Sequence, residues 1–396
     1  MPLPTPFHSR TAAICESYEW RDWSGFLAAA TYEPTHEREY FAIRNAAALI
    51  DVSPLFKYDI NGQDASRLVN KIITRDVSAM EVGQIYYSPW CDEAGHMIDD
   101  GTIWRLGEDH FRITAADPSL RWFQDCGFGF DARVSDVSRN LAALALQGPK
   151  ARAVLSQAVE DLDLDELKYY RLAQAKIAGF PVTITRTGFT GDLGYELWVA
   201  VANAEAMWDQ LMDAGRPFGL LPAGMVALDI ARIEAGLLLI EVDYISSFKA
   251  LIESRKSSPF EAGLGWTVSK TKDRFVGQKA LAAEREKGSK WALVGLQIDW
   301  PELENLFASH DLPPQVAGRA SRVAVPLYNN NRQVGQVTSS TFSPVSKRYI
   351  ALATVESEFA QTGTELEVEI TVEFSRHSCL ARVVDTPFYD PPHKRS

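Results

Sequence analysis

The sequence predicts an α+β protein of two or three domains, in which a mixed body precedes a smaller all-β unit. The chain of 396 residues is longer than one hydrophobic core usually supports. Strand and helix patterns alternate without a regular repeat as far as about residue 290, and strand patterns alone follow from Trp291. The polar stretch EREKGSK (284–290) lies between the two parts and is predicted to be a linker.

Composition excludes several classes of protein. An apolar content of 46% with 11% aromatic residues favours packed cores over disorder, and a net charge of −12 argues against a nucleic-acid partner. The four cysteines are far apart and form no CxxC pair, which predicts reduced, buried thiols rather than a zinc site or a disulfide framework. No metal site is expected.

The N-terminus and the apolar runs indicate where the protein resides. MPLPTPFHSRTAAIC (1–15) lacks the basic region and apolar core of a secretory signal. No apolar run approaches the roughly 20 residues that a membrane span needs. We therefore expect a soluble, cytoplasmic protein without a membrane partner.

The first half of the chain alternates strands and helices. FKYDINGQDASRLVNKII (56–73) predicts a strand, an Asn-Gly turn and a helix that begins near Asp64. Three strands of a meander follow at 84–90, 97–106 and 110–116. The next segment, 141–162, changes from strand to helix, with Pro149 where a first-turn proline is tolerated.

The second half begins with a hairpin, PVTITRTGFTGDLGYELWVA (181–200), whose glycines we attribute to backbone conformation rather than to phosphate binding. Two helices follow, NAEAMWDQLMDAG (203–215) and AGMVALDIARIEAG (223–236), each closed by a glycine suited to a left-handed cap. The later strands are predicted at 291–298, 322–340, 349–355 and 364–374.

The common sequence motifs of nucleotide-binding proteins, hydrolases and metalloproteases are absent. The candidate site residues are instead carboxylates within predicted strands. In MIDDGTIWRL (97–106), strict alternation places Asp100 on one face with Ile98 and Trp104, and Asp99 on the other. One of the two is predicted to be enclosed, and a turn-forming Asp beside Gly101 is the alternative.

Two further polar residues have open interpretations. Glu196 shares a strand face with Trp198, which indicates that this face is not wholly exposed to solvent. A solvent-facing Glu is the alternative. Arg232 lies three residues after Asp229 on a predicted helix. This pair fits a surface ion pair, and it also fits an arginine that is oriented towards a carboxylate ligand.

Eight ordered motifs, from about residue 40 to residue 390, resemble those of the folate-dependent aminomethyltransferases, whose type member is the T-protein of the glycine cleavage system. The motifs are IRNAAALIDVSPLFKYDINGQDA, YYSPWCDEAGHMIDDGTIWRLGEDHF, LALQGPKA, RTGFTGDLGYELWV, PAGMVALDIARIEAGL, SPFEAGLGWTV, FVGQKAL and GQVTSSTFSP.

The resemblance implies a three-domain cloverleaf with folate in a central channel and a barrel-like C-terminal β domain. Domain one would comprise 1–52 plus 137–238, and domain two would comprise 53–136 plus 239–285. Domain three would comprise 286–396.

The resemblance also implies roles for single residues, with tetrahydrofolate as the cofactor. Asp100 matches the catalytic carboxylate that lies near folate N5, and Glu196 matches the carboxylate that holds the pterin ring. Tyr87 and Tyr170 match tyrosines of the folate site, and Arg232 matches an arginine at the substrate end.

Several positions depart from the T-protein pattern. Phe189 and Thr114, both at the expected folate site, replace a Tyr and an Asn, and Leu228 replaces an Arg. The segment at the substrate end, 237–266, is several residues longer than usual and carries Asp243 and Tyr244. Such changes predict a different one-carbon donor, because an unmatched buried polar group penalises the wrong ligand.

The donor is expected to be a small methylated substrate. The aromatic N-terminus, with YEWRDWSGF (18–26), Tyr32 and Tyr40, suits an aromatic or methylated cationic donor, or else belongs to the core. The favoured function is a demethylase-type transferase that makes 5-methyltetrahydrofolate from an O-, N- or S-methyl compound. A T-protein-like aminomethyltransferase with a lipoyl carrier protein is the alternative. A non-catalytic folate-binding protein is weaker, because KDRFVGQKA (272–280) lacks the cysteine of that branch. Oligomeric state is not predicted.

Overall fold

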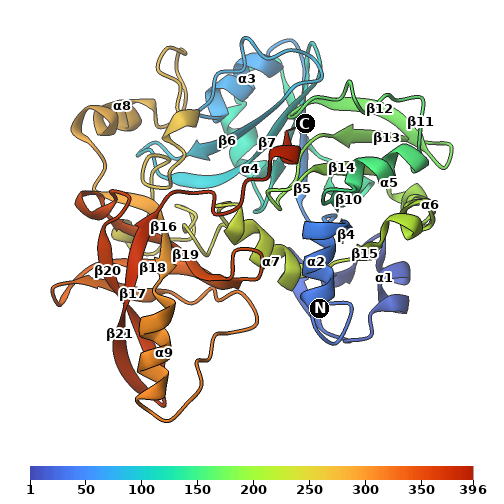
Figure 1. Ribbon diagram of the computed structural model, residues 1–396. Coiled ribbons are helices and arrows are strands. Elements are labelled where there is room, and N and C mark those ends of the chain that lie inside the picture. Colours follow the sequence, from blue (N-terminus) through green and yellow to red (C-terminus); the bar gives the residue numbers. More distant parts are fainter. Residues whose placement is uncertain (396) are drawn as a thin grey trace.

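The computed structural model describes residues 1–395 and shows three lobes around the helix α7 (Met225–Glu234) (Figure 1). α7 packs against α2 (Glu37–Asn45) and against two strands of the C-terminal barrel. Nine of its residues, Val226 to Glu234, are buried, which explains why its sequence is apolar on most sides. A helix in this position contacts more than one lobe.

A seven-stranded sheet forms one lobe, and its strands come from distant parts of the chain. β4 pairs with β10 in the antiparallel sense and with β15 in the parallel sense. Helices α5 and α6 pack on one face of the sheet, and α2 and α7 pack on the other. In sheet order the strands are β11 (Val159–Glu160), β12 (Leu172–Ile177), β13 (Phe180–Thr185), β14 (Gly194–Ala200), β10 (Leu141–Gln147), β4 (Ala47–Asp51) and β15 (Leu220–Pro222), with α5 at Ala151–Ala158 and α6 at Ala204–Gly215.

A small three-stranded sheet lies at the N-terminus. It consists of β1 (Leu3–Pro4), β3 (Phe26–Ala29) and β2 (Trp20–Trp23), and α1 (His8–Ile14) lies between β1 and β2 in the sequence.

A five-stranded sheet forms the second lobe, and it confirms the predicted meander. The helix predicted near Asp64 is also confirmed, because α3 begins at Ala65. α3 and α4 pack against the sheet. In sheet order the strands are β6 (Ile85–Cys91), β7 (Met97–Gly107), β8 (His110–Ala115), β5 (Phe56–Asn61) and β9 (Arg133–Asp136), with α3 at Ala65–Ile72, α4 at Leu120–Cys126 and α8 at Gln278–Lys287.

A bulge in β7 corrects the predicted alternation. Trp90 of β6 faces Asp99, but the next residue, Cys91, faces Met97, so Ile98 is an extra residue. Ile98 therefore packs in the cluster that holds Ile103, and Trp104 packs elsewhere. The prediction that Ile98 shares a face with Asp100 is wrong because strict alternation assumes an unbroken ladder.

The third lobe is a closed six-stranded barrel, as the β-rich C-terminal sequence predicts (Figure 1). A helix that the sequence reasoning missed, α9 (Trp300–Ala308), packs on it. Asp299 caps this helix by accepting a hydrogen bond from the backbone N–H of Glu302 at 2.9 Å, followed by Pro301 in the first turn. In barrel order the strands are β16 (Trp291–Ile298), β19 (Arg348–Glu356), β18 (Arg332–Ser343), β17 (Val325–Asn329), β20 (Glu365–Val372) and β21 (Ser375–Val384).

Two local predictions are wrong. The predicted linker 284–290 is mostly the end of α8, which extends to Lys287. Gly215 is helical, with φ −81°, and the left-handed residue is Gly219, with φ +77°. Gly215 is needed for packing, because a β-carbon there would lie 2.2 Å from Leu220 Cδ2. The other predicted cap, Gly236, does adopt a left-handed conformation, with φ +66°.

The remaining sequence predictions concern burial and domain limits. All four cysteines are buried free thiols. Tyr32 and Tyr40 belong to the core. No helix among residues 1–395 is long and apolar enough to cross a membrane. The exact domain boundaries stay a prediction.

Candidate functional site

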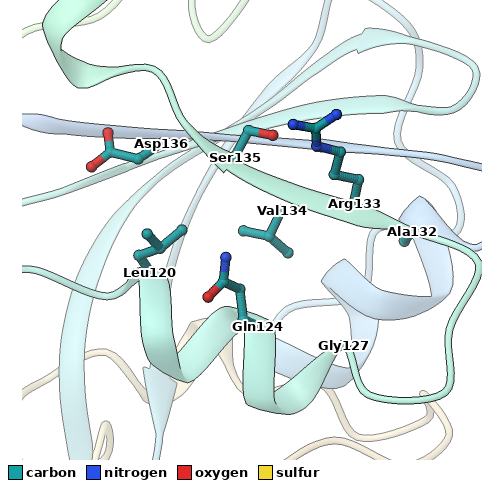
Figure 2. Close-up of a pocket in the computed structure, with 8 residues that line it drawn as sticks. All are labelled: Leu120, Gln124, Gly127, Ala132, Arg133, Val134, Ser135 and Asp136. Carbon is teal, nitrogen blue, oxygen red and sulfur yellow. The ribbon is translucent and has the colours of Figure 1, made fainter.

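Two of the hollows that residues 1–395 form are of similar size. A groove of about 530 Å³ lies between α4 and β9, where Leu120, Gln124 and Val134 point towards one another (Figure 2). None of the residues predicted for a site lines this groove. The second hollow, a cavity of about 520 Å³, lies between the lobes, and its walls include residues of all of them.

Most of the predicted site residues meet in this central cavity. The predicted residues that line it are Tyr87, Asp100, Thr114, Tyr170, Phe189, Glu196 and Arg232. Asp243 and Tyr244 do not line it, and they bond instead to residues that do. The structure therefore separates the two predicted substrate-side residues of the long segment from the cavity surface.

Asp100 is held by two tyrosine hydroxyls. Tyr87 on the neighbouring strand donates to Asp100 Oδ2 at 2.6 Å, and Tyr244 donates to Oδ1. Burial raises the pKa of Asp100, and the two hydroxyls oppose this rise because they stabilise the carboxylate. Asp100 is thus a carboxylate of fixed orientation whose pKa lies above its ordinary value.

Asp99 has a different environment, although it is the adjacent residue. Its carboxylate is fully buried and accepts hydrogen bonds from the backbone N–H groups of Asp100, Ala116 and Asp117 at 2.8, 3.1 and 2.9 Å. Burial, followed by the charge of Asp100, raises the pKa of Asp99 well above its ordinary value. Both carboxylates point inward. Asp99 binds backbone N–H groups of its own strand and of the segment after β8, and Asp100 faces the cavity.

Gly101 belongs to the strand and is not part of a turn, so the turn interpretation of this Asp pair is wrong. A β-carbon at Gly101 would lie 1.9 Å from the carbonyl oxygen of Thr114. The Thr114 hydroxyl bonds that of Thr102 at 2.7 Å, and Thr102 accepts from the indole of Trp104 at 2.8 Å. β7 and β8 are therefore in close contact beside Asp100, where Gly101 and Thr114 form part of the cavity wall.

Glu196 faces the cavity from β14. Its partners are two threonine hydroxyls, Thr187 at 2.8 Å and Thr185 at 3.4 Å, and no Lys or Arg forms an ion pair with it among residues 1–395. Burial raises its pKa, and the hydroxyls oppose the rise. The solvent-facing alternative is therefore wrong. Thr185 and Thr187 were missed, although Thr185 pairs with Glu196 across the hairpin and Thr187 follows two residues later.

The glycines between the hairpin strands serve mainly to admit Gln147. A β-carbon at Gly188 or Gly194 would lie 2.0 or 2.3 Å from the Gln147 amide oxygen, which accepts from Thr190 at 2.8 Å. Only Gly191 among them has a positive φ, +72°. The predicted conformational role therefore holds for Gly191 alone.

Arg232 is buried with 1% of its side chain exposed, so the surface ion pair is wrong. Its Nε donates to Asp229 at 2.8 Å, and its Nη1 donates to Asp243. Asp243 also accepts from the hydroxyls of Thr338 and Ser339 at 2.6 Å each. Asp243 is therefore fully engaged in holding the arginine, which itself reaches the cavity.

Other cavity residues were not predicted from the sequence. Trp266, which is mostly exposed, stacks on Tyr87 with ring centroids 6.3 Å apart. Arg322, from the loop before β17, donates to Asp229 at 2.7 Å. Arg21 and Trp23 line the cavity from β2, and Trp23 belongs to the aromatic stretch 18–26 that the sequence suggested for the donor. Trp266 and Arg322 lie outside the strands and α-helices, and the strand predicted at 322–340 begins only at Val325.

Family models agree with this arrangement along the chain. Residues 6–272 match the GCVT N-terminal domain, and residues 315–390 match the glycine cleavage T-protein C-terminal barrel domain. The aminomethyltransferase of Moorella thermoacetica is 35% identical over 377 residues, which cover 94% of each chain. That of Bacillus subtilis is 33% identical over 359 residues, covering 89% of this chain and 90% of the relative.

A relative with a different name matches as well. The trimethylamine-oxide aldolase of Ruegeria pomeroyi is 34% identical over 413 residues, covering 100% of this chain but 48% of the aldolase. The chain thus spans about half the length of that relative and nearly the full length of the aminomethyltransferases.

A solved structure shares the fold. The glycine cleavage system aminomethyltransferase T from Bartonella henselae superposes with a TM-score of 0.83 and 25% identity, covering 98% of this chain and 99% of that one. The family models, the relatives and this structure agree, and the chain belongs to the aminomethyltransferase family of the glycine cleavage T-protein.

Proposed function

We propose that the protein transfers a one-carbon group from a small O-, N- or S-methylated compound to N5 of tetrahydrofolate. One observation carries the proposal: two differently held carboxylates, Glu196 and Asp100, face the same enclosed cavity. The volume of about 520 Å³ lies within the usual range of roughly 300–1,000 Å³ for small-molecule sites.

Glu196 fits the pterin end of the folate. A pterin presents paired N–H donors, and a buried carboxylate with only hydroxyl partners has acceptor capacity left for them. Tyr170, Phe189 and Trp266 supply aromatic walls for the rings. Thr187 keeps the carboxylate in place through its 2.8 Å hydrogen bond.

Asp100 fits the reacting end. Tetrahydrofolate supplies the accepting nitrogen, N5, and the donor supplies the methyl group. The methyl–heteroatom bond breaks as a bond to N5 forms, and the bonding electrons stay on the heteroatom. The proton displaced from N5 goes to that heteroatom, so the transfer needs no oxidant. Asp100, fixed by Tyr87 and Tyr244, accepts the proton and returns it to the leaving group.

The long segment supports a small donor. It sends Tyr244 to Asp100 and places 237–240 on the cavity wall, where the family pattern has a shorter connection. The name of the trimethylamine-oxide aldolase also supports a methylated donor in this branch. The second candidate, an aminomethyltransferase that needs a lipoyl carrier protein, is supported by relatives that match over nearly their full lengths.

The nature of the folate product tests the proposal. The protein is incubated under anaerobic conditions with tetrahydrofolate and either a panel of methylated small molecules or an aminomethylated lipoyl carrier protein. 5-Methyltetrahydrofolate formed from a small molecule supports the proposal. Methylenetetrahydrofolate formed only with the carrier refutes it in favour of the second candidate. Folate binding without any product would indicate a non-catalytic binding protein.

A further inference from the structure

We infer that the one-carbon donor is a small acid, whose carboxylate binds to three arginines at one end of the cavity. This arginine end comprises Arg21, Arg232 and Arg322, all of which line the cavity. The inference rests on the proposed function for the reaction, and it concerns only how the donor is recognised.

Arg232 has a buried hydrogen-bond donor without an acceptor. Its Nε and Nη1 are satisfied by Asp229 and Asp243, but Nη2 has no hydrogen-bond partner among residues 1–395. A buried charged donor without an acceptor is energetically unfavourable. The side chain is held rigidly against the cavity wall, so an acceptor has to come from the cavity.

The other two arginines also have unused donors. In the described chain, Arg322 uses Nε for Asp229, and its side chain remains 36% exposed. No carboxylate lies within ion-pair distance of Arg21 anywhere in residues 1–395. Arg232 and Arg322 share Asp229 and therefore present N–H groups beside each other, and Arg21 lines the same cavity.

The neighbouring carboxylates have little acceptor capacity left. Asp229 uses one oxygen for Arg232 and the other for Arg322. Asp243 accepts four hydrogen bonds, from Arg232, Leu239, Thr338 and Ser339. Asp22, which also lines the cavity, accepts a hydrogen bond from the backbone N–H of Gly25 at 2.8 Å. Asp229 and Asp243 balance the charges of Arg232 and Arg322, whose remaining N–H groups are unused donors. A carboxylate offers two oxygens with about four acceptor positions and matches the guanidinium fork.

Two adjacent residues connect the arginine end to Asp100. Asp243 holds Arg232, and the next residue, Tyr244, holds Asp100, with Cα atoms about 3.8 Å apart. The apolar residues 237–240 also line the cavity. A donor that meets both groups carries a carboxylate at one end and the methyl-bearing heteroatom at the other.

This donor class replaces the aromatic or cationic donor suggested by the N-terminal sequence. Tyr32 and Tyr40 are buried in the core and do not line the cavity, whereas Trp23, from the aromatic stretch 18–26, does line it. A cationic headgroup at the arginine end would meet guanidinium groups and carboxylates that are already bonded. Short methoxy-, methylthio- or methylamino-carboxylic acids satisfy the open donors.

Matched acid and amide probes test the inference. Binding of formate, methoxyacetate and methoxyacetamide is measured by titration calorimetry, with the protein saturated by tetrahydrofolate under anaerobic conditions. We expect saturable binding of both acids, and roughly tenfold or more weaker binding of the amide. Absence of acid binding, or equal affinity for acid and amide, would overturn the inference.

Two variants locate the binding. Arg232→Gln should weaken both acids roughly tenfold or more while tetrahydrofolate affinity stays unchanged, which also shows that the variant folds. Arg322→Gln, at a partly exposed position, should lower the affinity for both acids by roughly threefold or more. This variant tests the inference if Arg232→Gln does not fold.

Arg139→Gln is the matched control on the exposed surface, and its affinity for the acids should equal that of the wild type. Acid binding that is unchanged in both cavity variants contradicts the inference. Failure of the wild type to bind tetrahydrofolate contradicts the proposed function instead.

Discussion

Tyr244 donates its hydroxyl hydrogen to Asp100, although the two residues are 144 positions apart in the sequence. Tyr87 donates to the other oxygen of the same carboxylate from the adjacent strand. Asp100 is therefore oriented both by its own sheet and by a segment that follows α7. Changes in either partner should alter the carboxylate without removing it.

Asp100→Asn should lower turnover by about 10²–10⁴-fold, because an amide cannot accept and return the proton. The affinity for tetrahydrofolate should change by about threefold or less, since Glu196 holds the pterin in the proposed site. Single-turnover kinetics and equilibrium binding separate these effects. Asp99→Asn is the contrasting variant: it should lower the free energy of unfolding by about 1–3 kcal/mol, because an amide would meet backbone N–H donors. Equal turnover in wild type and Asp100→Asn would exclude the catalytic role.

Glu196→Gln should weaken tetrahydrofolate binding by roughly 10–100-fold, because the amide loses half of the acceptor capacity offered to the pterin. At saturating folate, turnover should fall much less than in Asp100→Asn. Fluorescence titration measures the affinity. Thr187→Val, which removes a hydrogen bond to Glu196, should show a smaller effect in the same direction. An unchanged dissociation constant in Glu196→Gln would rule out the pterin contact.

Tyr244→Phe should move the acidic limb of the pH–rate profile to higher pH. The Tyr244 hydroxyl stabilises the ionised form of Asp100, so its removal raises a pKa that burial has already raised. Loss of one charged hydrogen bond corresponds to about one pH unit. The rate is lost as pH falls through this pKa, because the protonated acid cannot accept a proton. Tyr328→Phe, on the barrel, is the control and should leave the pH–rate profile unchanged. An unchanged profile in Tyr244→Phe would refute the proposed stabilisation of the Asp100 carboxylate by Tyr244.

Gly101→Ala should destabilise the protein by about 3 kcal/mol, because the added carbon would lie 1.9 Å from the Thr114 carbonyl oxygen. Denaturant unfolding measures the change. Gly318→Ala is the control, since a β-carbon there meets nothing within 4 Å. An equal free energy of unfolding for Gly101→Ala and Gly318→Ala would contradict the prediction, because it would mean that β7 and β8 can move apart at Gly101 at little cost.

Lys57→Met should remove part of the pH dependence of stability. Burial lowers the pKa of Lys57 to about 7, so between pH 7 and its unfolded pKa near 10.4 the unfolded state binds more protons than the folded state. Wild-type stability should therefore rise with pH in this window. From pH 7 to pH 9 the contribution is about 2 kcal/mol, and the variant should lack it. Urea unfolding at both pH values gives the comparison, and identical slopes would contradict a depressed pKa.

The alternation of apolar and polar residues, and the runs of apolar residues, predicted the regular strands and helices of the fold. The alternation around Glu196 predicted its hairpin, and the apolar run of α7 predicted a buried helix. The bulge at Ile98 could not be predicted, because an inserted residue leaves no mark in the pattern of side chains. Gly215 was misjudged because its reason is a contact with Leu220, and not the local backbone.

The site was predicted where residues match a motif and missed where tertiary contacts create it. Asp100 and Glu196 lie in the cavity, as the motif implied, although their roles stay predictions. Asp243 was predicted at the substrate end, but two of its four hydrogen bonds come from Thr338 and Ser339, about a hundred residues away in sequence. Arg322 lies in an irregular loop, and only the folded barrel brings it to Asp229.

The insertion of the five-stranded sheet between β4 and its partners has a consequence for synthesis on the ribosome. β4 ends at Asp51, but β10 begins at Leu141 and β15 at Leu220. At about 5–20 residues per second, the nascent β4 lacks its first neighbour for roughly 5–20 s. Its wholly apolar AALI run is exposed during that interval. Slow translation before residue 147 therefore prolongs the period in which the chain is most prone to aggregate.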